Sequence, residues 1–422
     1  MSVLDGIRTP ALLKAPSRPA PAAAPAPPVK IVPLIVGVVA AVALGVAVQR
    51  VGGTRTLWLY VIGLALGVAL FHSRFGFTSA WRQLVTVGQG RALRAHMLML
   101  GTACVLFAPI LSGLVGFGGP KPAGNIEPIS AGLFIGAFAF GVGMQLGGSC
   151  ASGTLFAIGS GQSAIVLTLA GFITGSVLGT ATFSFWTDVM PVGPEVSLAQ
   201  SRLGYGGALV VQLAIMAAIA LATLAVARRR RPPEIANPPR ARGLRRVVRG
   251  AWPLWAGALA LAALNAATLA VSGKPWGITS AFALWGAKIA QGLGLDVAGW
   301  SYWSAPKNAA MLNAPVLADK TSVMDVGIML GALAASAAAG TFVLHRRVPW
   351  RLAAGAIAGG ILMGYGARIA YGCNIGSYFS GIASFSLHGW IWGAMALLGT
   401  FGGVALRPLI GQANPKPTDS VC

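Results

Sequence analysis

Two cysteines of this chain lie in glycine-rich stretches that resemble each other. Cys150 lies in GGSCASGTLF at 147–156, and Cys373 lies in YGCNIGSYFS at 371–380. Glycine allows a helix to break and lets the backbone approach a partner closely. If a helix restarts after each cysteine, its free N–H groups and positive dipole end can bind an anion without a cationic side chain. The pattern therefore predicts an anion site formed by Gly148, Ser149, Cys150, Gly153, Gly372, Cys373, Asn374 and Gly376.

The similarity of the two stretches is part of a longer repeat. When the sequence is shifted by 223 positions, Cys150 aligns with Cys373, and five of the seven glycines between 131 and 156 align with another glycine. Such self-similarity indicates a duplicated structural unit. The same glycines could instead serve close packing of membrane helices, because small residues let two helix backbones touch. The sequence leaves both uses open.

A second motif is repeated at a different offset. GFTSAW stands at 76–81 and GITSAF stands at 277–282, which are 201 positions apart. Each half of the chain therefore carries one such motif followed by one cysteine motif. We expect hydroxyl groups of Thr78, Ser79, Thr279 and Ser280 to contribute to the same site.

The composition shows which elements must position these motifs. Of the 422 residues, 55% are hydrophobic and 9% are charged, whereas about 25% are charged in soluble domains. Several uncharged stretches reach the length of about 20 residues that a helix needs to cross a bilayer. The sequence therefore predicts an all-α polytopic membrane protein. We place its apolar runs at 31–49, 57–72, 95–113, 130–146, 162–183, 206–227, 251–271, 324–344, 352–370 and 384–406.

The basic residues predict the orientation of these runs. The formal net charge is +22, and the densest cluster is RRRRPPEIANPPRARGLRRVVR at 228–249. Cationic clusters between apolar runs mark cytoplasmic segments, and no aromatic residues stand between these charges to stack on bases. We therefore expect 228–249 and both termini in the cytoplasm, the loop 184–205 on the far side, and no nucleic acid as a partner.

The repeats and the linker predict the domain organisation. We divide the chain into a disordered Pro/Ala-rich tail at 1–30, a first transmembrane repeat at 31–227, a basic linker at 228–250, a second repeat at 251–406 and a C-terminal tail at 407–422. We expect two inverted-topology repeats of about five helices each, with broken helices or short half-helices at the Cys/Gly motifs. In many transporters with this architecture the substrate site lies near the midplane between the repeats.

The motifs GGSCASG and YGCNIG, within duplicated halves of an apolar and basic chain, resemble those of the YeeE/YedE sulfur-transport family. The resemblance covers about 57–406 and implies an inner-membrane carrier or channel-like protein for thiosulfate or a related sulfur anion. It also implies that Cys150 and Cys373 contact the substrate in passing. The characterised importers use a further cysteine nearer the N-terminus, where this chain reads RFGFTSAWR with Thr78 and Ser79. A hydroxyl contact at Thr78 would replace it.

The chemistry of a thiol suits such a passage. Thiosulfate is a dianion with a soft terminal sulfur, and a protonated thiol is a weak, polarizable hydrogen-bond donor. Weak contacts suit a pathway, in which binding must permit both capture and release. A thiolate would instead repel the dianion.

The remaining polar residues add one candidate to the site. Arg368 lies five residues before Cys373 inside an apolar run, where it either serves the substrate or extends toward the membrane surface. We expect Cys104 to be a buried apolar residue and Cys422 to be incidental. Four scattered histidines show no metal-ligand spacing, so no metal or cofactor is expected. The sequence also lacks G-x-x-x-x-G-K-[ST], so we expect no ATP hydrolysis by this chain and no enzymatic activity.

The sequence thus predicts transport of thiosulfate or a related anion across the bacterial inner membrane, through a central pathway lined by the Cys/Gly motifs. Two alternatives stay open. One is a membrane thiol–disulfide or sulfur-relay protein that uses Cys150 and Cys373, although no C-x-x-C occurs. The other is a membrane subunit that anchors a soluble sulfur enzyme. The partners expected are a small sulfur-containing anion, the lipid bilayer and, as a further candidate, a soluble cytoplasmic sulfur-carrier protein.

Overall fold

The computed structural model describes residues 27–234, 243, 245–344 and 348–419. Most of the tail predicted at 1–30, the middle of the linker predicted at 228–250 and Cys422 lie outside the described residues.

Nearly all of the described chain is helical. The elements are α1 (Ile31–Ser73), α2 (Phe77–Val87), α3 (Arg91–Leu111), β1 (Pro128–Ser130), α4 (Ala131–Leu146), α5 (Ala151–Gly159), α6 (Ala164–Ala181), η1 (Phe185–Val189), β2 (Val192–Glu195), α7 (Gly204–Arg230), α8 (Arg245–Arg249), α9 (Leu254–Ser272), α10 (Thr279–Gly292), α11 (Ser301–Ser304), α12 (Pro306–Asn313), η2 (Val316–Ala318), α13 (Lys320–Ala338), α14 (Trp350–Ile369), η3 (Asn374–Ser380), α15 (Gly381–Ala383), α16 (Leu387–Leu406) and η4 (Arg407–Ile410).

The structure confirms a polytopic membrane protein. Nine helical stretches in the described part are long and apolar enough to cross a bilayer. Each of the ten predicted apolar runs overlaps one of them, and the first two runs share α1. Helices are the expected solution because lipid offers no partner to backbone N–H and C=O groups, so these groups must bond within the segment.

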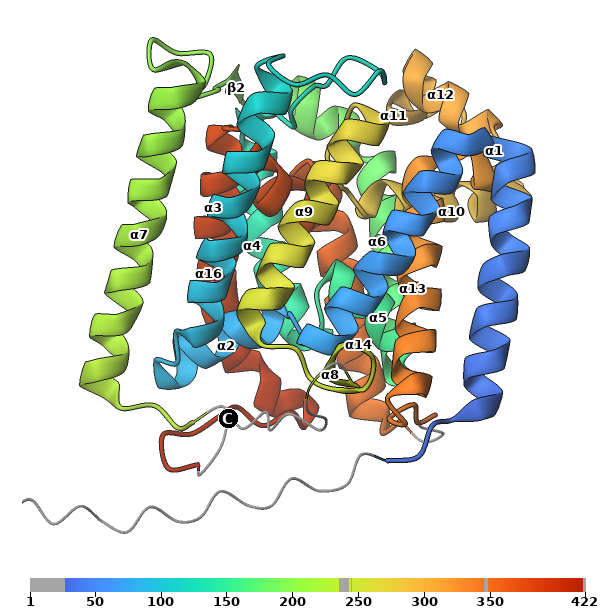
Figure 1. Cartoon of the computed structure of the whole chain (residues 1–422). Coiled ribbons are helices and arrows are strands. Elements are labelled where there is room, and N and C mark those ends of the chain that lie inside the picture. Colours follow the sequence, from blue (N-terminus) through green and yellow to red (C-terminus); the bar gives the residue numbers. More distant parts are fainter. Residues whose placement is uncertain (1–26, 235–242, 244, 345–347, 420–422) are drawn as a thin grey trace, which may run out of the picture.

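Helix α1 accommodates two crossings because it is a hairpin. Gly53 has φ 74° and ψ −177°, a conformation outside the helical region that suits glycine, and the chain reverses there. The hydroxyl of Tyr60 on the second arm donates to the carbonyl of Ala41 on the first arm over 3.0 Å. In Figure 1 the first arm stands at one edge of the molecule, and the second arm slants from the top of the first toward the middle.

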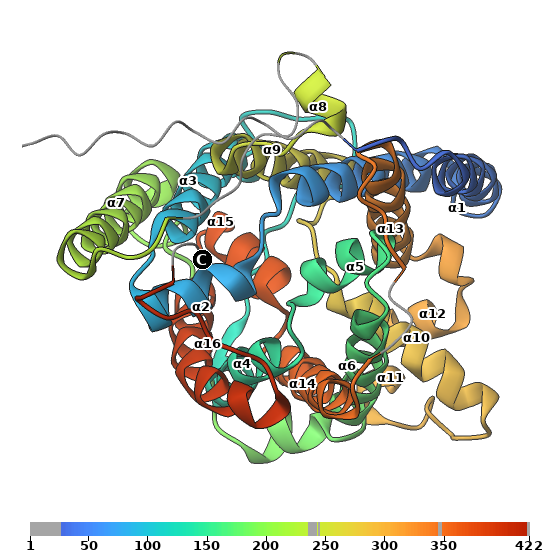
Figure 2. The same ribbon diagram turned by 90° about the horizontal axis from the view of Figure 1, so that it is seen from below.

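The long helices form two rows (Figure 2). In one row α3 packs on α9, α9 on the second arm of α1, and α1 on α13. In the other row α16 packs on α4, α4 on α14, and α14 on α6. Helix α7 lies outside the first row against α3, and the first arm of α1 lies outside it against α13.

Short helices fill the space between the rows. Helices α2 and α5 lie toward the end of the molecule that carries α8, whereas α10 lies toward the end that carries α11 and α12 (Figure 1). The segment η3–α15 also lies near that second end, since Phe385 just after it accepts a backbone hydrogen bond from Leu198 beyond β2. The half-helices expected at the Cys/Gly motifs are therefore present. A continuous set of buried rings joins them to the rows, and it comprises Phe282, Phe172, Phe140, Trp392, Trp81, Tyr378 and Phe77.

The repeated glycines of α4 and α14 serve helix packing. A Cβ atom added at Gly136 would lie 2.6 Å from the carbonyl oxygen of Gly366, and one added at Gly143 would lie 2.6 Å from that of Gly359. Real Cβ atoms do not approach a backbone oxygen so closely. These four glycines are therefore needed for the two backbones to touch, which is the packing use that the sequence left open.

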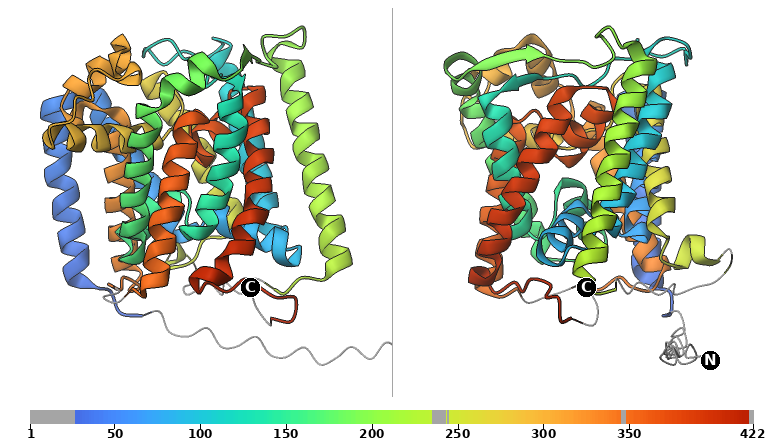
Figure 3. Two further views of the ribbon diagram at one scale, coloured as in Figure 1. Left: turned by 180° about the vertical axis from the view of Figure 1, so that it is seen from behind. Right: turned by 90° about the vertical axis from the view of Figure 1, so that its left-hand side faces the viewer.

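Three features differ from the sequence expectations. The all-α fold includes a small antiparallel sheet of β1 and β2 at the end of the molecule opposite α8 (Figure 3). The segment between α10 and α13 forms α11, α12 and η2, which were not predicted. Part of the C-terminal tail packs on the fold, because Arg407 donates to the carbonyl of Gln145 and Gln412 donates to that of Leu146.

Candidate functional site

Cys150 caps a short helix that starts inside the protein. The chain turns between α4 and α5 at Gly148, whose φ of 76° lies in the left-handed region. Cys150 then has an extended backbone, and its carbonyl accepts the first helical bond from Thr154 over 2.8 Å. Its Sγ lies 3.5 Å from the hydroxyl of Ser152, and the side chain is 1% exposed. The sequence builds this turn because glycine at 148 takes a left-handed conformation at little cost.

Cys373 occupies the corresponding position after α14. Tyr371 and Gly372 both have positive φ, of 61° and 152°, and Cys373 is extended before η3 begins. Tyr371 aligns with Gly148 at the offset of 223, so both turns use the left-handed region at the same repeat position. The Sγ of Cys373 accepts a hydrogen bond from the N–H of Ile375 over 3.4 Å. Its side chain is fully buried.

The two cysteine turns meet between the rows. Helix α5 packs against η3, and Cys150 and Asp325 of α13 are the ionisable groups that act on Cys373. Several buried polar atoms around these turns have no hydrogen-bond partner within the described part of the chain. They are Thr154 Oγ1, both side-chain atoms of the Asn374 amide and both carboxyl oxygens of Asp325.

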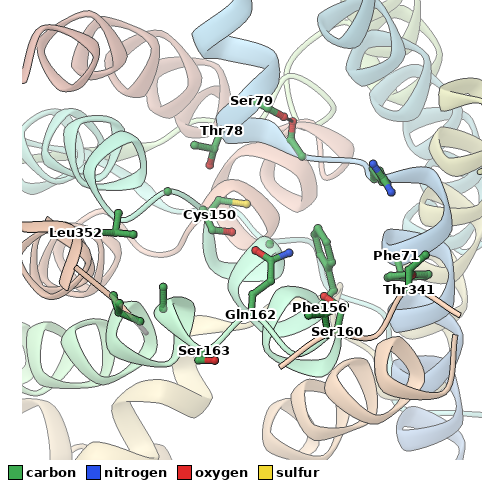
Figure 4. A pocket seen from close by; sticks show the side chains of 18 residues that line it. Phe71, Thr78, Ser79, Cys150, Phe156, Ser160, Gln162, Ser163, Thr341 and Leu352 are labelled. Carbon is green, nitrogen blue, oxygen red and sulfur yellow. Dashed lines mark hydrogen bonds between the residues drawn. The ribbon is translucent and has the colours of Figure 1, made fainter. Parts of the chain in front are cut away.

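A cavity of about 680 Å³ leads to Cys150 (Figure 4). Of the predicted site residues, Thr78, Ser79, Gly148, Ser149, Cys150 and Gly153 line it. Its wall also includes Gln162 from the turn after α5, and Thr341 and Leu352 from either side of the α13–α14 connection. These segments lie at the end of the molecule that carries α8 (Figure 1), so the cavity belongs to that end.

The N-terminal turn of α2 contributes polar groups to this cavity. Thr78 is 4% exposed and its hydroxyl has no partner among the described residues. Its carbonyl accepts a hydrogen bond of 3.2 Å from the side chain of Gln145, which fixes α2 against the end of α4. Arg74 at the end of α1 also lines the cavity. Thr78 and Ser79 of the motif GFTSAW therefore line the same cavity as Cys150.

The candidates from the second half lie apart from this cavity. Ser280 donates to Thr321 of α13 over 3.0 Å, and Thr279 is 4% exposed at the start of α10. Arg368 hydrogen-bonds the hydroxyl of Tyr302, and its guanidinium carbon lies 5.0 Å from the centre of the Tyr302 ring. The arginine therefore holds α11 to the end of α14. In the described structure Gly372, Cys373, Asn374 and Gly376 also do not line the cavity.

A cluster of charges lies at the end of the molecule opposite the cavity. Burial raises the pKa of Glu127, just before β1, to about 7, and the nearby Glu195 acts in the same direction. Lys274, Arg368 and Lys307 act on the same carboxyl and oppose this rise. Glu127 therefore changes its charge near neutral pH, next to three cationic groups.

Other sequence expectations can be placed on the structure. Cys104 is fully buried in α3, where its Sγ lies 3.7 Å from the side-chain oxygen of Gln212. Within the described ranges no group of three or more His, Cys, Asp or Glu residues could hold a metal ion. Sequence reasoning missed Asp325, although an acidic residue inside the apolar run 324–344 was a visible signal.

Comparison with known proteins identifies the family. A family model described as sulphur transport matches residues 72–402. The chain belongs to the sulphur transport family. This membership confirms the resemblance that the two cysteine motifs carry.

Three relatives are named as transporters. The chain is 27% identical over 371 residues to the thiosulfate transporter TsuA of Spirochaeta thermophila, a match that covers 81% of this chain and 96% of that protein. It is 26% identical over 356 residues to TsuA of Escherichia coli, covering 81% and 91%. Its match to the probable transporter YedE of Salmonella typhimurium is 32% identical over 152 residues, and spans 35% of this chain and only 37% of that protein.

Proposed function

We propose that this protein carries thiosulfate or a related sulfur-containing anion across the bacterial inner membrane, along a path from the cavity past Cys150 to Cys373. The observation that carries the proposal is that Cys150 lines the cavity, while the helix that Cys150 caps packs against the segment that Cys373 caps. Family membership and the names of the two TsuA relatives support this substrate class.

The chemistry of the cavity fits a soft anion. Buried thiols at Cys150 and Cys373 offer weak, polarizable contacts to a terminal sulfur. The unpartnered hydroxyl of Thr78 offers a hydrogen bond to an oxygen, at the place where the characterised importers use a further cysteine. The start of α5 adds a positive dipole end. These contacts are individually weak, so they permit release as well as capture.

We infer further that the two halves are inverted repeats, with their boundary before α7. A boundary at the basic linker leaves six of the ten apolar runs before it and four after it. An even number of crossings would give both halves the same orientation. Division into 31–181 and 204–406 gives five crossings to each half in the described chain, and an odd number inverts the second half.

The contacts between helices support this division. Exchange of the halves relates α3 to α13, α4 to α14, α6 to α16, and the second arm of α1 to α9. If the two halves are equivalent, the α3–α9 contact corresponds to the α13–α1 contact, and the α4–α16 contact corresponds to the α14–α6 contact. All four contacts occur. The exchange also relates α7 to the first arm of α1. Gly37 of that arm faces Leu333 of α13, and Gly101 of α3 faces Leu213 of α7.

The orientation follows from the basic segments. Arg228, Arg229 and Arg230 end α7 on the side that carries α8, which is also the side of the first and last described residues. The positive-inside tendency puts this side in the cytoplasm. A membrane-impermeant thiol reagent should then label Arg231→Cys only in inverted vesicles and Ser201→Cys only in right-side-out vesicles. The reverse pattern would exclude this orientation.

The thiol relay receives no support from the comparisons, because the relatives are named as transporters. A soluble cytoplasmic sulfur carrier stays a prediction, and the cavity on the proposed cytoplasmic side is where such a protein would receive the anion.

Uptake into liposomes tests the proposed function. We expect purified protein to take up labelled thiosulfate without a reductant, with competition by selenium analogues and sulfite exceeding that by sulfate. Cys150→Ala and Cys373→Ala should each lower uptake by at least about tenfold, the effect of losing about 1.4 kcal/mol of interaction.

Cys104→Ala is the control for a buried thiol, because Cys104 is equally buried but contacts Gln212 of α7 and the carbonyl of Ile382 in α15, and does not line the cavity. Its uptake, normalised to inserted protein, should stay within about twofold of the original, as usual for a substitution outside the site. Full uptake by Cys150→Ala and Cys373→Ala would exclude the thiol-lined path.

A further inference from the structure

A carboxyl group of α13 lies in the interior without any partner. Asp325 is 0% exposed, and neither of its oxygens has a hydrogen-bond partner in the described structure. Burial of an unpaired carboxylate is strongly unfavourable, because no solvent or counter-charge replaces its hydration. An ionisable residue within a membrane-spanning helix is expensive and is usually retained for function. A buried carboxyl group without a partner in this helix therefore points to a functional role for Asp325.

The position of Asp325 directs it toward the two cysteine turns. Met329 and Ala332, which follow Asp325 by four and seven residues, face Gly159 of α5. Residues at these spacings share one face of a helix. Asp325 therefore lies on the face of α13 that packs against α5, whereas Met324 and Ile328 face Gly63 and Gly67 of α1. Asp325 also acts electrostatically on Cys373.

The charged groups on the neighbouring elements do not compensate Asp325. Within the described chain, the one ionisable group that acts on it is Asp319, one and a half turns earlier, which is itself acidic. Other groups on the elements packed against α13 are engaged elsewhere. Tyr60 of α1 donates to Ala41, Lys288 of α10 donates to Leu312, Arg246 of α8 donates to Ala251, and Cys150 lies beside Ser152.

We propose that Asp325 is a proton-binding site whose occupation is coupled to passage of the anion. This inference rests on the proposed transport function. An ionised Asp325 beside Cys373 would repel a dianion, whereas the neutral acid can donate its O–H to it. Protonation and anion binding therefore strengthen each other, and such a coupling is necessarily reciprocal. The proton comes from water on the side where the anion binds, stays on the carboxyl while the anion passes, and leaves to water on the side of release.

Proton movement with thiosulfate tests the coupling in liposomes that contain the full-length protein. Thiosulfate is a dianion at neutral pH and brings no proton itself, so it is the suitable probe. An internal pH dye should report acidification that depends on thiosulfate influx. In Asp325→Asn the number of protons moved per thiosulfate should fall by at least about fivefold, the lower range of such couplings. In Asp325→Glu it should return toward the original value.

Asp319→Asn is the matched control, because asparagine retains the N-cap of α13 while removing the nearest carboxylate. Its proton-to-thiosulfate ratio should equal that of the original protein. Thiosulfate influx without protons in the original protein, or an unchanged ratio in Asp325→Asn, overturns the inference and leaves the transport function intact. Absence of any thiosulfate influx in the original protein overturns the transport function, and the inference with it.

A binding measurement covers variants that do not transport. Titration calorimetry of the purified protein with thiosulfate, in two buffers of different ionisation enthalpy, counts the protons taken up on binding. Proton uptake by the original protein that is lost in Asp325→Asn supports the site. Equal proton uptake by both, or none by either, refutes it.

Discussion

Cys150 and Cys373 cap short helices at equivalent positions, yet only Cys150 borders the cavity in the described structure. The turn before Cys150 opens toward α2, whereas the turn before Cys373 is closed by Trp392, whose indole N–H donates to the carbonyl of Gly372 over 3.2 Å. Beyond Cys373 lie unpartnered groups on Asn374 and Asp325. The two turns therefore share one backbone design but differ in whether a ligand can reach the cysteine. The cavity on the α8 side gives a ligand access to Cys150, whereas Cys373 does not border that cavity.

The strongest test of this difference is the reactivity of the two thiols. In a variant without Cys104 and Cys422, an impermeant thiol reagent applied from the α8 side should label Cys150 at least about tenfold faster than Cys373, since thiol reactivity requires access. Mass spectrometry of the two cysteine-containing peptides measures this ratio. Thiosulfate should slow only the labelling of Cys150 at short times. Equal rates would mean that both turns open to the same space.

The glycines that follow the cysteines offer a second test. A Cβ atom at Gly153 would collide with the hydroxyl of Ser149 and lie 3.5 Å from Cys150 Sγ, whereas one at the equivalent Gly376 would meet nothing within 4 Å. We expect Gly153→Ala to lower thiosulfate uptake about threefold to tenfold, because the turn must rearrange by about 1 kcal/mol. Gly376→Ala should stay within about twofold. Equal losses of thiosulfate uptake in the two variants would show that the two cysteine turns do not differ in the space around their glycines.

Gly63 and Gly171 also lie in apolar runs, but they are unsuitable as neutral controls for these substitutions. An added Cβ at Gly63 would lie 2.5 Å from the carbonyl oxygen of Met324, and one at Gly171 would press on the backbone of Ile357. Gly206 has no atom within 4 Å and is the better control.

The smallest effect is expected at the charged end beyond Cys373. Because burial raises the pKa of Glu127 to about 7, this carboxyl is neutral below that pH and ionised above it. Loss of its charge leaves Lys274, Arg368 and Lys307 less compensated, so a dianion should be attracted more strongly as the pH falls from 8 to 6. We expect the apparent KM for uptake from this side to decrease about twofold to threefold over that range, as for one charge near a surface.

Glu127→Gln should remove the part of this pH dependence that arises from Glu127, so that its KM changes less between pH 8 and 6 than that of the original protein, as measured by initial rates in right-side-out vesicles. A pH dependence in Glu127→Gln equal to that of the original protein would assign the whole effect to another group. The surroundings of Cys150 and Cys373 would then not differ through the charge of Glu127, but the two cysteines would still differ in their access to the cavity.

Much of the fold could be predicted from the sequence. Long uncharged runs force helices because lipid cannot satisfy the backbone, and the flanking glycines of Cys150 and Cys373 indicated the breaks. The sequence alone suggested a boundary of the repeats at the basic linker, whereas we propose one before α7. The basic linker marks the side of the membrane, and this property does not depend on where a duplicated unit begins. Helix α7 has no motif that would assign it to one half.

The candidate site could be predicted only in part from the sequence. We expected Thr78 and Cys150 in one site because each half carries one TSA motif followed by one cysteine motif, and in the structure both residues line one cavity. The single-sided cavity depends on how the rows close around α2 and η3, which no local pattern encodes. Arg368 aligns with Gln145 in the repeat, but it contacts Tyr302 of an insertion that the first half lacks. Equivalent positions therefore do not share roles where the halves differ in their loops.

The glycine contact between α4 and α14 has a mechanical consequence. Because the backbones touch at Gly136, Gly143, Gly359 and Gly366, the pair can neither separate slightly nor slide by a fraction of a turn without losing its fit. It forms a stiff unit within the row of α16, α4, α14 and α6 (Figure 2). A rearrangement that closes the cavity beside Cys150 would then move other elements around this pair and leave the contact within the pair unchanged.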